Sequence, residues 1–239
     1  MIVLAIDTCE ARGSVAVLND DTILQVVAHT GGEEYSSWLL PAVDMALQSA
    51  KSTLAEVDVF AVAPGPGSFT GVRIGLTTVK AWSEIFDKPI VALSRLEAVA
   101  AQSRHEHPYV ASFIDAQRGQ LFGALYKRAS SGLRLIQEEM VAAPEDFLDW
   151  VDRQVAGDQV VWISTDPDAV ARQSAWQGRA PQGQAIDNVP CILAPLIGKM
   201  AYQRALKGEV LDALSVDANY VRRSYVEAFQ KGPTYMPGK

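Results

Sequence analysis

Two aspartates lie where predicted strands end, a position in which carboxylates can hold the metal and phosphates of a nucleotide. Asp7 opens the turn sequence DTCEARGS, and Asp115 opens the turn sequence DAQRGQ. A phosphate site needs small residues at such turns, because backbone N–H groups must approach the oxygens. Both turns are bulky instead, and Glu10 adds a negative charge where a phosphate would sit. We therefore favour the alternative that each aspartate caps its own turn.

The segment Gly65-Pro66-Gly67-Ser68 is a second candidate for anion binding. Glycines before a helix can expose N–H groups whose direction agrees with the helix dipole. No lysine follows these glycines, and their spacing is not that of a Walker loop. A tight strand-to-helix turn with Ser68 as N-cap explains the pattern better. The alternative is a vestigial nucleotide cleft, with the candidate residues Asp7, Thr8, Gly65, Gly67, Ser68 and Asp115.

Metal binding and nucleophilic catalysis have little support in the pattern. The three histidines are His29, His105 and His107, and none has a histidine partner four residues away. Cys9 and Cys191 make no disulfide framework, and scattered His and Cys residues make no ligand set. No Ser–His or Cys–His arrangement indicates a nucleophile. We expect no catalytic residue, no metal and no cofactor in this chain.

Composition is typical of a globular protein and argues against direct binding of nucleic acid. The chain has 239 residues, is 49% hydrophobic and carries a formal net charge of −7. Phosphate neutralisation supplies much of the affinity for nucleic acids, so an acidic chain needs a basic partner to work on RNA. The start MIVLAIDTCE has no basic lead-in and contains Asp7, as a buried strand does and a signal peptide does not. No apolar run approaches the roughly 20 residues of a membrane span, so we expect a cytoplasmic protein without membrane contact.

Periodicity predicts an α/β order of elements that restarts midway. The predicted first half holds strands Ile2–Thr8, Ser14–Asn19, Ile23–His29, Val57–Ala63 and Ile90–Leu93, with helices Glu33–Ser49, Ser68–Phe86 and Ser94 to about Ser103. The predicted second half holds strands Tyr109–Ile114, Gln120–Lys127, Leu133–Val141 and Val160–Ser164, with helices Pro144–Val151, Asp166–Trp176 and Pro195–Lys207. We expect Gln177–Pro190 to be a loop and the tail Lys231–Lys239 to be loose.

The restart indicates an internal duplication, because each half has a strand ending in Asp, an Arg-Gly turn and a returning strand. The alternative is that strand–turn–strand units share such residues by chance. A repeated meander, helix, strand, helix and strand is the layout of the actin-like (ASKHA) fold, with two ribonuclease-H-like halves of mixed sheets flanked by helices. We predict a subdomain over 1–103, a smaller one over 104–193, a helix at about 194–208 packed on the first, and a partly flexible extension over 209–239.

Helix Ser68–Phe86 has more apolar surface than one core contact needs. Its charged residues Arg73, Lys80 and Glu84 fall on one narrow stripe. A surface helix normally shows a single apolar stripe, so we predict that this helix is covered on two sides. Gly71 and Gly75 stand one turn apart, and each costs about 1 kcal/mol relative to alanine. Close approach of another backbone would offset that cost.

Helix Glu33–Ser49 also has a second apolar set, formed by Trp38, Leu40, Met45 and Leu47. Two neighbouring helices with spare apolar faces predict a protein–protein interface. The alternative is that both faces pack within a large core. The predicted interface residues are Tyr35, Trp38, Leu39, Gly71, Val72, Gly75, Thr78, Val79 and Trp82.

Several segments together resemble the TsaB (YeaZ) family: MIVLAIDT, LLPAV, APGPGSFTGVRIG, IDAQRGQLFGALY and NYVRR. The resemblance covers essentially the whole chain, and PGSFTGVRIG is its most specific part. It implies a degenerate actin-like fold and a non-catalytic subunit in the synthesis of tRNA N6-threonylcarbamoyladenosine (t6A). It also implies that a TsaD transferase carries the metal and pairs with this chain, that a TsaE ATPase docks on the pair, and that tRNA is met only indirectly. The older superfamily name, glycoprotease, does not describe this branch.

The sequence also departs from the pattern of its relatives at several positions. The resemblance places Arg95 and Val99 where two metal-binding histidines of TsaD lie, and neither side chain has a lone pair to give. Tyr35 stands where many relatives have histidine, so any role of that histidine is in doubt. Val160–Asp168 lacks the glycine-containing turn that is common at that point, which makes residual nucleotide binding less secure.

Two other hypotheses stay open. The first is an ATP-dependent enzyme or sugar-kinase-type ATPase that acts on its own, motivated by the two aspartate turns. The second is a homodimer formed by the same helices when the partner is absent. Arg222, Arg223 and Lys231 are candidates for RNA or partner contact, although a solvated basic end explains them more simply.

Overall fold

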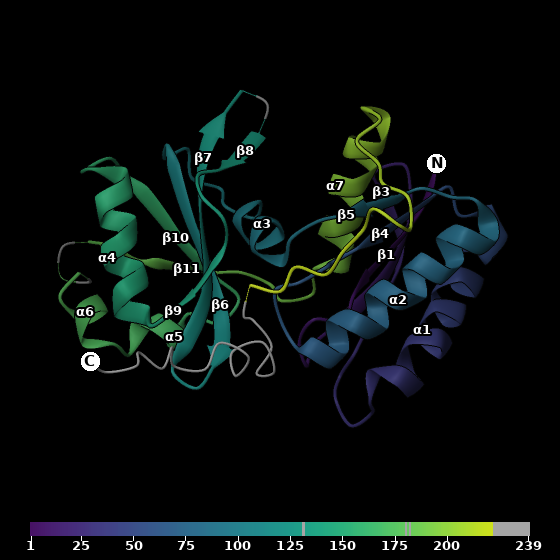
Figure 1. Cartoon of the computed structure of the whole chain (residues 1–239), viewed down its shortest axis with the longest axis horizontal. Helices are drawn as coiled ribbons and strands as arrows, with labels where there is room; N and C mark the ends of the chain where they lie inside the picture. The colour runs from purple at the N-terminus through teal and green to yellow at the C-terminus, as the bar shows by residue number, and fades with distance from the viewer. Residues whose placement is uncertain (131, 180, 182, 222–239) are drawn as a thin grey trace, which may run out of the picture.

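The chain folds into two α/β lobes, and the computed structural model describes residues 1–130, 132–179, 181 and 183–221 (Figure 1). The first lobe contains β1 (Ile2–Asp7), β2 (Ser14–Asn19), β3 (Thr22–Ala28), α1 (Tyr35–Ser49), β4 (Val59–Val62), α2 (Phe69–Phe86) and β5 (Ile90–Ala92), followed by α3 (Arg95–Ala100). The second contains β6 (Tyr109–Gln117), β7 (Gln120–Ala129), β8 (Gly132–Leu135), β9 (Met140–Ala142), α4 (Pro144–Val155), β10 (Val160–Ser164), α5 (Asp168–Ala171), α6 (Ser174–Gln177) and β11 (Ile186–Asn188), followed by α7 (Ala194–Leu206).

The two sheets have the same strand order and the same strand directions. The first has the order β3-β2-β1-β4-β5, in which β1 to β3 form an antiparallel meander and β4 and β5 continue parallel to β1. The second has the order β8-β7-β6-β10-β11 with the same directions, and β9 pairs with β7. This match confirms the predicted duplicated, actin-like arrangement of mixed sheets flanked by helices.

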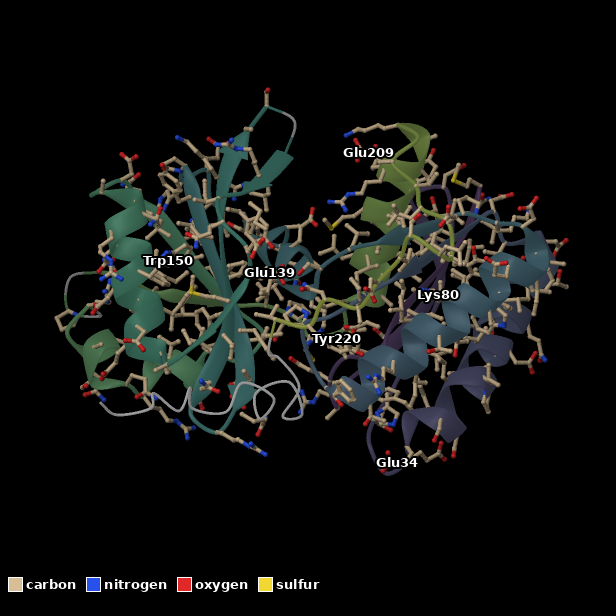
Figure 2. All side chains as sticks on the ribbon, in the orientation of Figure 1. Glu34, Lys80, Glu139, Trp150, Glu209 and Tyr220 are labelled. Atoms are coloured by element: carbon tan, nitrogen blue, oxygen red, sulfur yellow. The ribbon has the colours of Figure 1, made fainter. Side chains whose placement is uncertain are left out.

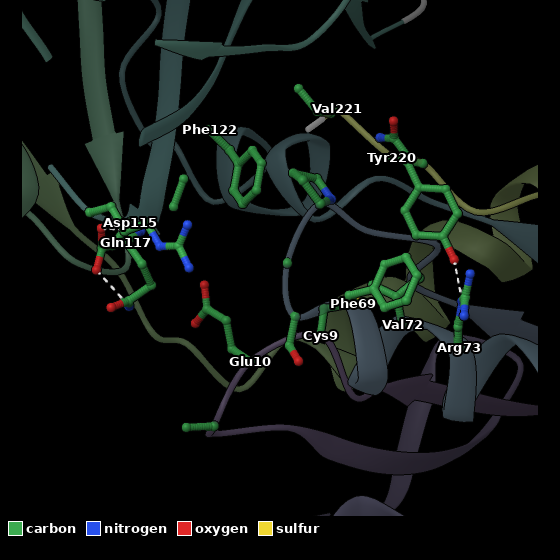
Figure 3. Close-up of a pocket in the computed structure, with 17 residues that line it drawn as sticks. Cys9, Glu10, Phe69, Val72, Arg73, Asp115, Gln117, Phe122, Tyr220 and Val221 are labelled. Carbon is green, nitrogen blue, oxygen red and sulfur yellow. Dashed lines mark hydrogen bonds between the residues drawn. The ribbon is translucent and has the colours of Figure 1, made fainter. Parts of the chain in front are cut away.

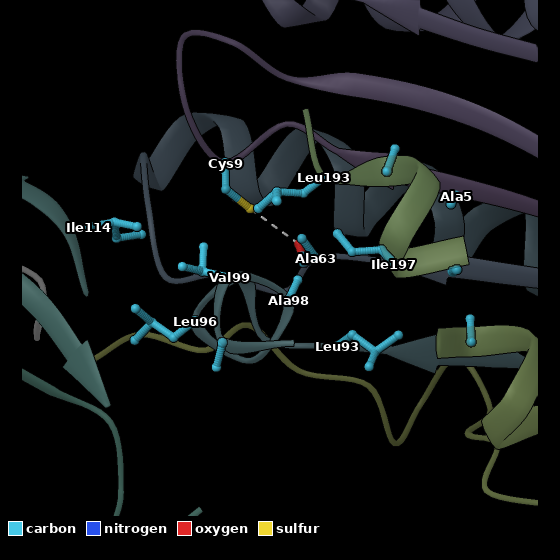
Figure 4. Close-up of a cluster of buried hydrophobic side chains, with 14 of the residues drawn as sticks. Ala5, Cys9, Ala63, Leu93, Leu96, Ala98, Val99, Ile114, Leu193 and Ile197 are labelled. Atoms are coloured by element: carbon cyan, nitrogen blue, oxygen red, sulfur yellow. Dashed lines mark hydrogen bonds between the residues drawn. The ribbon is translucent and has the colours of Figure 1, made fainter. Parts of the chain in front are cut away.

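The helix that ends each half packs against the sheet of the other half. Helix α3 follows β5 but packs on β6 and β7, whereas α7 follows β11 but packs on β1 and β2. Figure 4 shows the resulting shared core, in which Leu96 and Val99 of α3 and Ile197 of α7 lie near Ile114 of the second sheet and Ala5 of the first. Burial of each large apolar side chain contributes about 1.5–3 kcal/mol, so this cluster joins the lobes.

The outer faces of the sheets are covered by the remaining helices. Helices α1 and α2 cover the outer face of the first sheet through a cluster that includes Leu39, Phe60 and Val79. Helices α4 to α6 cover the second sheet through aromatic side chains that include Phe147, Trp162 and Trp176. The order of layers is therefore α1/α2, first sheet, α7 and α3, second sheet, α4 to α6 (Figure 1).

Residues 209–221, here called the C-terminal strap, return to the first lobe. Leu211 exchanges backbone hydrogen bonds with Ile90 of β5, and the side chains of Ala213 and Val216 are buried with the α1/α2 core. The rest of the predicted extension lies outside the described residues, and so do the expected loose tail Lys231–Lys239 and the basic residues Arg222, Arg223 and Lys231.

The predicted elements differ from the structure mainly in the second lobe. The single strand expected over Leu133–Val141 is two strands, β8 and β9, which pair with different parts of the same edge of β7. The helix expected over Asp166–Trp176 is two short helices, and the expected loop Gln177–Pro190 contains β11. Strand β11 is short and polar, and its strand conformation depends on pairing with β10. Within the described ranges, no helix is both long and apolar enough to cross a bilayer.

Candidate functional site

Both aspartates that the sequence singled out cap the turns that follow them, as predicted. Asp7 is fully buried at the end of β1 and accepts a hydrogen bond from the amide of Cys9 at 3.0 Å. Asp115, near the end of β6, accepts from the amide and the side-chain amide of Gln117, each at 2.8 Å. Much of the acceptor capacity of both carboxylates is therefore used locally.

A cleft of about 970 Å³ lies between the lobes at these turns (Figure 3). It is lined by the turn after β1, the start of α2, the β6–β7 turn and the end of the strap. Its wall includes Glu10, Phe69, Asp115, Phe122 and Tyr220. The cleft combines aromatic surface with carboxylates from both lobes.

The acidic groups at this cleft lie close enough to affect one another. The pKa of Asp166 is raised by partial burial and then by the negative charges of Asp115, Asp168 and Glu10. The wall of the cleft also carries Arg73 and Arg118, so a triphosphate there would meet charges of both signs.

The glycine-rich loop before α2 is packed against the turn after β1. The amide of Ser68 donates to the carbonyl oxygen of Cys9 at 2.6 Å, and the Ser68 hydroxyl accepts from the amide of Gly71 at 3.4 Å. A Cβ at Gly67 would lie 2.2 Å from the Cys9 carbonyl oxygen. Ser68 is the N-cap, as predicted, and these amides serve packing within the lobe.

Arg95 fills the space beside Asp7 with a positive charge. Its side chain is fully buried at the start of α3, with Nε 3.1 Å from Asp7 Oδ2 and Nη1 2.5 Å from Glu10 Oε1. Burial disfavours the charged form, but Asp7 and Glu10 outweigh that effect, so the pKa of Arg95 lies above its ordinary value. Val99, one turn later, is also fully buried.

These residues do not fit a metal ion. A guanidinium has no lone pair to donate, and its charge repels a cation. In the part of the chain that the structure describes, no group of three or more His, Cys, Asp or Glu residues could hold a metal. Burial raises the pKa of the Cys9 thiol well above its ordinary value, so this cysteine has no nucleophilic character.

The close approach that was expected at Gly71 and Gly75 comes from their own chain. A Cβ at Gly71 would lie 2.0 Å from the carbonyl oxygen of Thr8, and one at Gly75 would lie 2.4 Å from Thr8 Oγ1. The backbone that approaches helix α2 is therefore the end of β1. No partner backbone is needed to explain them.

Five of the nine predicted interface residues are buried in the isolated chain. They are Leu39, Gly71, Val72, Gly75 and Val79, each buried in the first lobe. The physical reason is that α2 crosses the end of β1 closely, which turns its small-residue face inward. Trp38, Thr78 and Trp82 remain partly exposed.

Tyr35 is partly exposed too, but its hydroxyl is engaged within the chain. It accepts from the amide of Gly13 at 2.7 Å and donates to the carbonyl oxygen of Glu10. Burial raises the pKa of Tyr35 to about 12. Tyr35 therefore holds the turn after β1 in place, together with the ring of His29, whose centroid lies 4.6 Å away.

An apolar stripe remains exposed where α1 and α2 meet. On α2, Ile74, Thr78, Trp82 and Ile85 follow helical spacing, and Ile85 is 72% exposed. Leu40 of α1 is 56% exposed and lines a shallow groove together with Ile74, Thr77 and Thr78. We call Leu40, Ile74, Thr77, Thr78, Trp82 and Ile85 the α1–α2 surface.

Sequence reasoning missed the strap as a functional element. Arg73 donates to the Tyr220 hydroxyl at 2.8 Å, and Lys80 donates to the carbonyl oxygen of Val216 at 2.7 Å. Asn219 reaches the other lobe, where its side chain donates to Glu139 at 2.6 Å. Figure 2 labels Glu139 and Tyr220, the residue that follows Asn219. The charged stripe of α2 was the available signal, since two of its three residues bind the strap.

The family model for TsaD, tRNA N6-adenosine threonylcarbamoyltransferase, matches residues 18–162 of this chain. The chain is 34% identical to the tRNA threonylcarbamoyladenosine biosynthesis protein TsaB of Bacillus subtilis over 149 residues, which are 62% of this chain and 65% of that protein. It is 35% identical to TsaB of Escherichia coli over 150 residues, or 61% and 64%. The matched region thus spans slightly less than two thirds of these curated relatives.

Solved structures agree with this similarity. A Pseudomonas aeruginosa protein described as similar to peptidase YeaZ has a TM-score of 0.73 at 25% identity, covering 92% of this chain and 99% of that one. A Streptococcus pneumoniae ROK family protein in complex with sucrose has a TM-score of 0.50 at 13% identity, covering 87% and 100%. The second likeness shows the fold alone.

Proposed function

The chain belongs to the tRNA N6-adenosine threonylcarbamoyltransferase (TsaD) family and, within it, to the TsaB (YeaZ) proteins, and from this premise we propose that it is a non-catalytic subunit of t6A synthesis. In this proposal the chain pairs with a TsaD-type transferase and activates it. The transferase supplies the metal and the chemistry, and tRNA binds to the assembly through the partners.

The observation that carries the proposal is the exposed α1–α2 surface. Single exposed apolar residues are ordinary, but a contiguous stripe along one helix beside a groove is typical of a docking surface. The ring of Trp82 packs against the ring of Phe60, and their centroids lie 5.8 Å apart. A rigid, half-buried aromatic residue of this kind is a favoured anchor in protein interfaces.

The proposed lack of catalysis has its own support. Asp7 is neutralised by Arg95, and Glu10 lines the cleft where a phosphate would bind. A reaction at the first turn would therefore lack both a free carboxylate and a phosphate cradle. The alternative, an ATP-dependent enzyme acting alone, predicts that calorimetry of the chain with ATP and Mg²⁺ shows binding that Asp7→Ala abolishes.

The proposal also covers assembly. A TsaE-type ATPase would dock on the pair, and two copies of this chain would associate through the α1–α2 surface when the transferase is missing. Sedimentation of the chain with and without the transferase separates these states. A single complex that contains two copies of this chain together with the transferase would place the two contacts on different surfaces.

The direct test is copurification with a TsaD-type transferase, followed by a t6A assay with and without this chain. Because the chain is proposed to activate its partner, we expect modification to fall at least about tenfold when it is omitted. A transferase that forms t6A at the full rate alone would contradict the proposal.

A further inference from the structure

Arg95 connects the two lobes through ion pairs. It is the first residue of α3, which packs on the second sheet. Its ion-pair partners belong to the first lobe, since Asp7 ends β1 and Glu10 follows in the next turn. The contact therefore spans the junction between the lobes.

The arrangement holds two carboxylates and one guanidinium. The side chains of Asp7 and Arg95 are completely buried, whereas the Glu10 side chain is 30% exposed. Removing one member of a buried ion pair is strongly destabilising, because the remaining charge is left without a counter-ion. The position beside Asp7 therefore requires a cation.

We propose that Arg95 is a tethered counter-ion and that Asp7 and Glu10 form a cation pocket of their own, selective for a guanidinium group. A side chain of the chain itself spans the junction between the lobes. This inference does not depend on the proposed role in t6A synthesis.

The geometry determines which cation the pocket takes. Separate nitrogens of one planar group reach the two carboxylates, Nε toward Asp7 and Nη1 toward Glu10. A planar fork matches paired carboxylates, whereas a spherical ion or an ammonium presents one point of charge. Only Nε donates a hydrogen bond, to Asp7, whereas the contact of Nη1 with Glu10 is an ion pair. Nη1 and Nη2 are both buried without a hydrogen-bond acceptor among the residues that the structure describes. Free guanidinium has the same three nitrogens and can therefore replace the side chain.

The experiment uses the full chain with Arg95→Ala and follows thermal unfolding with and without guanidinium chloride. We expect the variant to melt about 10 °C below the wild type, since an unpaired buried carboxylate remains. About 20 mM guanidinium should raise its melting temperature by about 3 °C, as a site with a dissociation constant of about 5 mM requires. The same concentration of NaCl or tetramethylammonium chloride should give less than about 1 °C. Denaturation by guanidinium is negligible at this concentration.

A charge-free variant provides the matched control and covers the case in which Arg95→Ala does not fold. Asp7→Asn/Glu10→Gln/Arg95→Met keeps similar volumes without a charge to balance, so it should fold and gain nothing from guanidinium. If Arg95→Ala is insoluble, refolding yield in guanidinium against NaCl replaces the melting temperature. The proposal is overturned if Arg95→Ala is as stable as the wild type, if guanidinium does not restore it, or if guanidinium stabilises the charge-free variant equally.

Discussion

The hydroxyl of Thr8, one residue after β1, donates a hydrogen bond to the main-chain carbonyl oxygen of Gly71 in the first turn of α2, at 2.7 Å. The helix can approach the strand end this closely because Gly71 has no Cβ. This contact places the glycine face of α2 inside the lobe. It leaves the opposite face of the helix free to form the α1–α2 surface.

Replacing Gly71 should therefore destabilise the chain itself. We expect Gly71→Ala to lower the free energy of unfolding by about 2 kcal/mol, because overpacking against the Thr8 carbonyl exceeds the gain in helix propensity. Thr77→Ala, on the exposed side of the same helix, should change it by less than about 0.5 kcal/mol. Urea unfolding measures both, and a fully stable Gly71→Ala chain would refute this packing.

Tyr35→Phe should loosen the turn after β1. The variant leaves the amide of Gly13 without its acceptor, and an unsatisfied buried donor costs about 1–3 kcal/mol. The effect should also depend on pH, because burial raises the pKa of Tyr35 to about 12. The contribution is complete below the ordinary tyrosine pKa of about 10 and is lost as the pH rises toward 12. The stability difference between wild type and Tyr35→Phe should therefore shrink over that range.

Glu139 should show a pH dependence of the same sign, at lower pH. Burial raises the pKa of this carboxyl, which accepts hydrogen bonds from Ser94, Asn219 and Tyr126. A raised folded pKa means that its contribution is complete below the ordinary value of 4.5 and is lost as the pH rises through the shifted value. Glu139→Gln cannot ionise, so its stability relative to the wild type should rise as the pH increases above the ordinary value of 4.5. Equal pH profiles would contradict this assignment.

The end of the strap should loosen when its side-chain link to the second lobe is removed. Asn219 donates through its side chain to Glu139 and through its amide to Pro64 of the first lobe. We expect Asn219→Ala to lower stability by about 1–2 kcal/mol and to speed proteolysis within residues 209–221. Leu214→Ala is the matched control, because Leu214 is 89% exposed on the same segment. Equal cleavage rates for both variants would show that Asn219 does not hold the strap.

The sequence predicted local features well and contacts between distant segments poorly. The capping by Asp7, Asp115 and Ser68 depends on neighbouring residues, and the repeated layout follows from local periodicity. Gly71 and Gly75 showed that something approaches the helix, but composition cannot say whether it belongs to this chain. The ion pair between Asp7 and Arg95 joins residues 88 positions apart, and a pattern along the chain does not contain that pairing.

The interface prediction failed in part for the same reason. The apolar faces of α2 were recognised, yet which face meets the core depends on where β1 ends relative to the helix. Trp82 and Thr78 lie on the exposed side, whereas Val72 and Val79 face the sheet. Leu40, in the second apolar set of α1, is exposed at the groove.

The most direct test of the proposed function is the dissociation constant of the complex with a TsaD-type transferase. Wild type is compared with Thr78→Arg/Ile85→Glu, which places two charges on the α1–α2 surface, and with Leu214→Glu, an equally exposed change on the strap. Melting temperatures within about 2 °C of the wild type establish that each variant is folded. We expect the double variant to bind at least about 100-fold more weakly, as the loss of two interface anchors implies, and Leu214→Glu to bind within about threefold of the wild type. Wild-type affinity in the double variant would contradict the account.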